Sequence, residues 1–136
     1  MTDMTAFHLE IVTPDGLCFE GEVESLLVRT DEGDVEILAG HADYLATLAT
    51  GRCRIRIGGE DKAAAVSGGF LSVDKKSVKL IATTFEFAED IDLSRANAAK
   101  EHAEAALAKA KNDRDYLVAK AKLQRAISRI SVAGKK

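Results

Sequence analysis

Basic side chains at helical spacing near the end of the chain are the clearest chemical feature of the sequence. Lys122, Arg125 and Arg129 are three and four residues apart, so in a helix they share one face. Guanidinium groups form paired hydrogen bonds with phosphate and carboxylate oxygens, which makes such a face suitable for a phosphate group or an acidic protein surface. A basic helix face that only contacts solvent has the same pattern, so both interpretations stand.

Patterns for catalysis or metal binding are weak. Ser67-Gly68-Gly69-Phe70 lacks the lysine and hydroxyl that end a phosphate loop, and we expect a strand bend or a close backbone approach there. Gly40-His41 indicates a turn with a surface histidine, and no serine or cysteine has an assignable base. The remaining candidates are scattered singly: His8, His102, Cys18 and Cys53. The sequence therefore predicts no catalytic residue and no metal site.

The composition limits the class of protein. The chain has 136 residues, of which 46% are hydrophobic and 30% charged, as expected for one or two small globular domains. Seven Phe and Tyr, no Trp and a net charge of −3 argue against a nucleic-acid partner. No apolar run approaches the ~18 residues of a membrane span, and no signal pattern opens the chain, so we expect a soluble, non-exported protein.

Charge is distributed unevenly along the chain. Residues 1–87 hold 8 Lys and Arg against 15 Asp and Glu, whereas residues 88–136 hold 11 against 7. A basic tail on an acidic body favours an acidic partner for the tail.

Short alternating segments separated by turn residues dominate the first 87 residues. Phe7, Leu9 and Ile11 alternate with polar residues, and the segment 52–57 places three arginines opposite an apolar face. Further strands are expected at 23–30, 63–66 and 78–82. Strands of this length and spacing predict a β-sandwich or a flattened barrel.

From residue 90 onward the apolar residues repeat with a helical period. Asp92 is a suitable N-cap for a helix over 93–110, and a second helix follows Asn112-Asp113 in an antiparallel hairpin. The expected apolar faces are Leu93, Ala96, Ala99, Ala103, Ala106, Leu107 and Ala110 in the first helix, and Tyr116, Ala119, Leu123, Ile127 and Ile130 in the second. Because alanine buries little area, we expect a hairpin that detaches easily from the rest of the protein.

Five motifs occur in order along the chain: Val12-Thr13-Pro14-Asp15-Gly16, Gly33–His41, Val66–Phe70, Asp90–Ala96 and Leu123–Ile130. Together they resemble the epsilon subunits of bacterial F-type ATP synthases over the whole length of the chain. The resemblance implies an α+β fold. An antiparallel β-sandwich of about ten strands is expected over residues 1–87, followed by a mobile two-helix hairpin over residues 88–136.

The resemblance also implies a function and a set of partners. A subunit of this family is a non-catalytic part of the central stalk, or rotor, of a proton-translocating ATP synthase. It couples proton flow to ATP synthesis and restrains ATP hydrolysis through its helices. The sandwich is expected to dock on the gamma subunit and the c-ring, with Asp34 and His41 as contacts, and the hairpin to reach the catalytic beta and alpha subunits through Lys122, Arg125 and Arg129. The expected location is the cytoplasmic face of the bacterial plasma membrane, through the complex alone, with no required cofactor.

Some members of the family bind a regulatory ATP between the sandwich and the folded hairpin, through an Ile/Leu-Asp-x-x-Arg-Ala motif that Ile91–Ala96 matches. By resemblance, the nucleotide contacts are Glu86, Asp92, Arg95, Ala96, Arg125 and Arg129. Asp92 also suits a helix cap, so the match alone does not separate the two roles.

The chain departs from the family pattern in one loop. Glu36, Ala39 and Asp43 replace a glycine and two prolines that are usual there, which predicts a less rigid loop. If Glu36 needed a positive φ, strain of about 1 kcal/mol or more would follow.

An alternative function belongs to a different class: a free-standing regulatory module that senses ATP through the hairpin and is not part of a rotary motor. A motor subunit would co-purify stoichiometrically with a gamma-like coiled-coil protein, whereas a free sensor would not.

Overall fold

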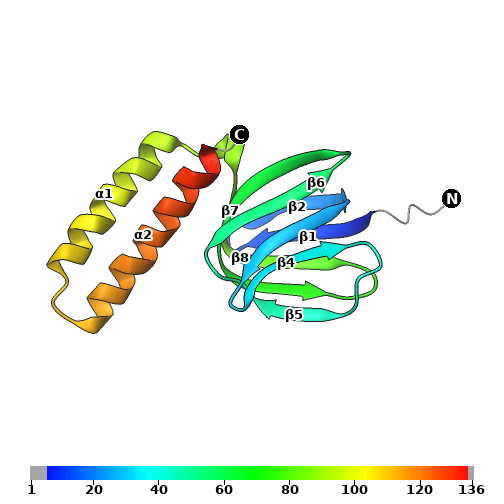
Figure 1. Cartoon of the computed structure of the whole chain (residues 1–136), viewed down its shortest axis with the longest axis horizontal. Coiled ribbons are helices and arrows are strands. Elements are labelled where there is room, and N and C mark those ends of the chain that lie inside the picture. Colours follow the sequence, from blue (N-terminus) through cyan, green and yellow to red (C-terminus); the bar gives the residue numbers. More distant parts are fainter. Residues whose placement is uncertain (1–5, 135–136) are drawn as a thin grey trace.

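The computed structural model describes residues 6–134, so residues 1–5 and 135–136 of the two expected domains lie outside the described part. Within that range, eight strands precede a helical hairpin (Figure 1). The strands are β1 (Phe7–Thr13), β2 (Gly16–Val23), β3 (Ser25–Thr30), β4 (Gly33–Leu38), β5 (Tyr44–Thr47), β6 (Gly51–Ile57), β7 (Glu60–Val73) and β8 (Val78–Phe87). The helical elements are η1 (Ala88–Asp90), α1 (Leu93–Lys109) and α2 (Asp113–Ala133). The predicted α+β class is confirmed.

The sheet folds around the long β7–β8 hairpin. Its strand order is β2-β1-β8-β7-β6-β3-β4, and β5 also pairs with β7. β6 pairs with the first half of β7 and β5 with the last four residues, so the two halves of β7 belong to different layers. Between these two halves of β7, Gly68 and Gly69 have φ of 68° and 101°. A Cβ on Gly69 would overlap the backbone carbonyl of Ile81 in β8. The predicted close backbone approach is therefore confirmed.

One hydrophobic core lies between the layers. Alternate residues of β1 point inward, and Leu9 and Ile11 are fully buried. β6 follows the same rule, with Cys53 and Ile55 inside and the arginines outside, so the alternation predicted for both segments is confirmed. Burial raises the pKa of the Cys53 thiol to about 12, which keeps this cysteine protonated and unreactive at neutral pH.

Three details of the strand prediction are wrong. The strand predicted at 23–30 begins later, because Val23 ends β2 and Glu24 separates it from β3; the backbone N–H of Glu24 donates to the carbonyl of Arg56 (2.7 Å). β1 pairs with β8 in parallel, so the sandwich is not wholly antiparallel. Eight strands replace the expected ten or so, since β7 and β8, at 14 and 10 residues, each continue through both layers.

Both helices begin at side-chain caps. The Asp92 carboxylate accepts a hydrogen bond from the backbone N–H of Arg95 (3.1 Å), which confirms the predicted N-cap. At the start of α2 the Asn112 side chain accepts one from the N–H of Asp115 (2.8 Å). No helix within residues 6–134 has the length and apolar character needed to cross a bilayer.

Alanines dominate the buried surface of the hairpin. The buried side chains between Leu93 and Ile127 are Ala96, Ala103, Ala119 and Ala126. The apolar faces predicted from periodicity are only partly covered, since Leu93, Tyr116 and Ile127 remain nearly half exposed. Two helices that meet through small side chains leave the larger residues at the margins in contact with solvent.

A second, smaller apolar cluster joins the base of the hairpin to the sandwich. Its members are Ala65 of β7, Ala88 and Ile91 of the connection, Ala96 of α1, and Val132 and Ala133 of α2. Figure 1 shows the helices projecting from one end of the sandwich, with the α1–α2 turn farthest from it. Among its buried members only Ile91 and Val132 are large, and the partly buried Ala63 and Ile130 pack against them, so this contact buries little apolar area.

Candidate functional site

A small cavity lies where the hairpin meets the sandwich. We call it the junction pocket; its volume is about 150 Å³ and it is lined by Glu86, Ile91, Asp92, Arg95, Ala96, Ala99 and Arg129. Glu86 comes from the end of β8, Asp92 and Arg95 from the start of α1, and Arg129 from the last turns of α2. The fold thus brings together five of the six residues that the resemblance assigned to ATP.

The junction pocket combines two guanidinium groups with two carboxylates. Nε of Arg129 lies 3.3 Å from Oε1 of Glu86, and both side chains are little more than one-third exposed. Arg95 is exposed and, among residues 6–134, has no ion-pair partner within 4 Å. Pockets for small molecules usually measure about 300–1,000 Å³. The junction pocket therefore has room for part of a nucleotide, such as its phosphates, and not for all of it.

The sixth residue, Arg125, lies elsewhere. It lines a broad groove of about 900 Å³ between α2 and the sheet, together with Arg29, Asp34 and Arg52. Lys122 is exposed on α2 and lines neither cavity. The basic row predicted on one helix face is thus divided, because Arg129 turns toward Glu86 and Arg125 toward the groove.

The two residues expected at the c-ring lie near opposite ends of β4. Asp34, its second residue, pairs with Arg29 (3.1 Å), and both are more than half exposed. His41 follows the strand, and its ring packs edge-on against Phe7 with centroids 5.6 Å apart. Within the described chain, His41 Nδ1 is buried without a hydrogen-bond partner. The structure does not bring Asp34 and His41 together in one site.

The departures from the family loop introduce no backbone strain. Outside glycine, no residue between 6 and 134 has a positive φ, so the strain considered for Glu36 is absent. Glu36 instead lies in β4 and pairs with Arg54 (2.9 Å). Arg56 donates to Asp61 (2.9 Å), which raises the pKa of Arg56 and lowers that of Asp61. Two arginines of the predicted row are therefore occupied by neighbouring carboxylates.

Sequence reasoning missed an exposed apolar row on the outer face of the sheet. In the ladder Leu17 pairs with Val12, Val12 with Ile81, and Ile81 with Phe70. Phe70 is 53% exposed, and Leu45, on the adjoining strand β5, is 72% exposed. We call Leu17, Val12, Ile81, Phe70 and Leu45 the apolar row. Each residue is isolated in sequence, so only the strand register reveals that they are neighbours.

Sequence reasoning also missed a cluster on the adjoining part of that face. Single ligand atoms of His8, Glu10 and Glu20 lie within 4.8 Å of one another. His8 and Glu10 are two residues apart, so the sequence alone places them on one face of a strand. That Glu20 lies beside them follows only from the register of β1 against β2.

Two family models together match the whole described range of the chain. Residues 6–88 match the beta-sandwich domain of the ATP synthase delta/epsilon chain, and residues 89–134 match the long alpha-helix domain of the same chain.

Full-length relatives and solved structures agree with this match. The ATP synthase epsilon chain of Bacillus velezensis is 44% identical, and the alignment covers 96% of this chain and 99% of the relative. That of Caldanaerobacter subterraneus is 39% identical, with 95% and 94% covered. A chain in the Euglena gracilis mitochondrial ATP synthase (OSCP/F1/c-ring) is similar in fold, with a TM-score of 0.81 at 22% identity, covering 100% of this chain and 85% of that one. By its sequence, over both domains, the chain therefore belongs to the ATP synthase delta/epsilon family.

Proposed function

We propose that the chain is a non-catalytic subunit of the central stalk of a bacterial, proton-translocating F-type ATP synthase. In this role it couples proton flow to ATP synthesis, and its helical hairpin restrains ATP hydrolysis. It works on the cytoplasmic face of the plasma membrane, where the complex holds it.

The observation that carries the proposal is the weak attachment of the hairpin in a chain of this family. Six buried residues, four of them alanine, form the centre of the apolar contact, and the partly buried Ala63 and Ile130 pack against it. The Arg129–Glu86 pair is partly exposed, and pairs of that kind contribute about 0–1 kcal/mol. A hairpin held by so little apolar area is released at a small cost in free energy, as a movable brake requires.

The exposed surfaces suit separate partners. The apolar row offers a docking face for the gamma subunit, since contiguous exposed apolar residues favour protein contacts. Asp34 and His41 are proposed contacts for the c-ring. Lys122 and Arg125, joined by Arg129 once it leaves Glu86, are proposed contacts for the catalytic subunits. In support, the similar folds come from assemblies described as OSCP/F1/c-ring and as central stalk/c-ring.

A regulatory ATP would bind at the junction pocket. Arg95 is available for the phosphates, and Arg129 becomes available when the nucleotide displaces Glu86. Both arginines belong to the hairpin while Glu86 belongs to the sandwich, so a ligand bound between them would stabilise the folded hairpin.

Co-purification with the gamma subunit tests the stalk assignment. The tagged full-length chain is expected to retain gamma stoichiometrically, and Phe70→Glu is expected to abolish this by placing a charge in the apolar row. Leu117→Glu is the matched control, because Leu117 is 62% exposed but lies on α2. Failure of the parent chain to retain gamma, combined with tight ATP binding, would favour the free-standing sensor instead.

A further inference from the structure

Four chemically active side chains share the outer face of the β1–β2 ribbon. His8 is paired with Glu22 across the ladder, and Glu10 with Glu20. Residues two apart on a strand point to the same side, so all four side chains leave the sheet together. None of them has a role in the proposed function.

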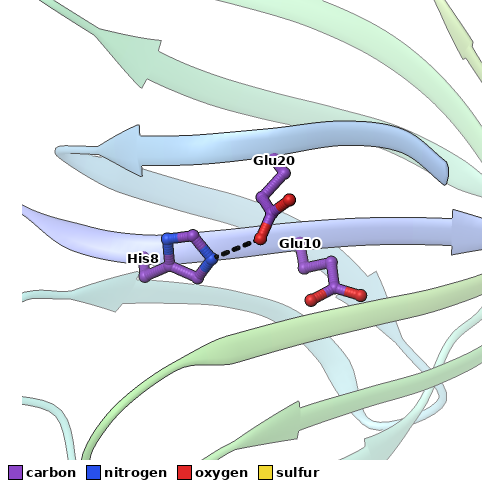
Figure 2. A group of neighbouring side chains, drawn as sticks. All are labelled: His8, Glu10 and Glu20. Atoms are coloured by element: carbon purple, nitrogen blue, oxygen red, sulfur yellow. Dashed lines mark hydrogen bonds and ion pairs between the residues drawn. The ribbon is translucent and has the colours of Figure 1, made fainter.

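The imidazole of His8 is held between two carboxylates. Its Nε2 lies 3.1 Å from Oε2 of Glu20, and its Nδ1 lies 3.7 Å from Oε1 of Glu22. Figure 2 shows Nε2 facing Glu20, with the Glu10 carboxylate beside them. Single ligand atoms of His8, Glu10 and Glu20 all lie within 4.8 Å of one another. Ligand atoms around a tetrahedral zinc ion are about 3.4 Å apart, so modest rotations of these side chains close the set.

Three carboxylates at this position repel one another. Like charges directly opposite in a ladder destabilise a sheet, and Glu10 faces Glu20 in that way. The nearest basic residue in the ladder is Lys79 of β8, opposite Glu10, yet among residues 6–134 no ion pair within 4 Å reaches Glu10. A cation on this face would relieve the repulsion.

We propose that His8, Glu10 and Glu20 bind a divalent transition-metal ion, with Zn²⁺ as the best match. A neutral imidazole nitrogen with two carboxylate oxygens is a ligand set that zinc accepts, and water would complete the tetrahedron. Calcium and magnesium prefer sets made of oxygen alone. Glu22 is a positioning residue: its Oε1 lies 3.7 Å from Nδ1 of His8, and a small rotation would let it accept the Nδ1–H and so leave Nε2 free to bind the metal.

Calorimetric titration of the full-length chain with Zn²⁺ tests the proposal. We expect one saturable site in the parent chain, its loss in His8→Gln and in Glu20→Gln, and affinity about tenfold lower in Glu22→Gln. His102→Gln is the matched control, because His102 is exposed on α1, and it should bind like the parent.

Thermal unfolding gives a second readout that also reports whether each variant folds. Zn²⁺ should raise the unfolding midpoint of the parent and of His102→Gln, but not that of a folded His8→Gln variant. Saturable binding that persists unchanged in His8→Gln, or its absence from the parent at about 1 mM Zn²⁺, would overturn the proposal. The site lies on the sandwich and does not depend on the hairpin or on assembly.

Discussion

Truncating Val132 should release the hairpin without unfolding the sandwich. Val132 is 1% exposed and is the largest fully buried side chain that α2 contributes to the contact with the sandwich. Val132→Ala removes two buried carbon atoms, worth about 1.6 kcal/mol at about 0.8 kcal/mol per group. That difference raises the population with a released hairpin about fifteenfold.

A thiol placed under the hairpin measures this population. Ala65 lies on β7, is buried beneath the hairpin, and belongs to the same cluster as Val132. In an Ala65→Cys, Cys18→Ser background the new thiol reacts with a disulfide reagent only when the hairpin lifts. The remaining cysteine, Cys53, is fully buried with a pKa of about 12 and stays unmodified. The labelling rate should therefore rise about fifteenfold with Val132→Ala.

Val118→Ala is the control for this measurement, because it makes the same chemical change on the same helix at a residue that is 48% exposed. It should alter the labelling rate less than about twofold. Equal rates for the two variants would refute the claim that this small contact holds the hairpin. A parent thiol that reacts as fast as a fully exposed one would refute the docked arrangement itself.

Three further predictions concern the backbone, a cap and a titrating turn. Gly69→Ala should destabilise the fold by about 3 kcal/mol or more in urea unfolding, because the added Cβ would overlap the backbone of β8. The control is Gly58→Ala, where φ is 57° and no atom lies close to the added Cβ, and it should cost about 1 kcal/mol. Asp92→Ala should lower the stability of the hairpin by about 1 kcal/mol, measured by circular dichroism, and Asp92→Ser, which keeps a capping oxygen, should restore it. If the Asp92 carboxylate also contacts ATP, both variants should bind ATP more weakly than the parent, which separates the two roles. Backbone N–H groups in the β7–β8 turn donate to the Asp74 carboxylate and hold its pKa below the usual 3.8. The carboxylate therefore stabilises the folded protein above pH 3.8, and this stabilisation is lost as the pH falls through the lower pKa of the folded state. The difference in unfolding free energy between the parent and Asp74→Asn should accordingly shrink at acidic pH.

Strand prediction from the sequence succeeded where one face of a strand is buried and the other is polar. β1 and β6 have this alternation, so their boundaries and inward residues were readable. β2 was missed because it is an edge strand whose residues are mostly exposed, and β5 because it has only four residues. The number of strands is lower than expected partly because Gly68 and Gly69 bend β7 without ending it.

The candidate sites likewise divide into those that were expected from the sequence and those that were not. The residues of the junction pocket came from resemblance, and five of them do lie together because the N-cap of α1, the end of β8 and the end of α2 converge. Arg125 lines the groove instead, and the spacing of residues along a helix does not say which neighbour each margin of the helix faces. The apolar row and the cluster around His8 depend on strand register, which one sequence does not specify.

The most direct test of the account is ATP hydrolysis by a catalytic head that lacks its epsilon chain. The head is titrated with the full-length chain and with residues 1–87, whose hydrophobic core is separate from the hairpin contact. Both are expected to bind gamma, and only the full-length chain is expected to suppress hydrolysis. Binding without suppression by the full-length chain would contradict the proposed brake, and no binding by either would contradict the stalk assignment.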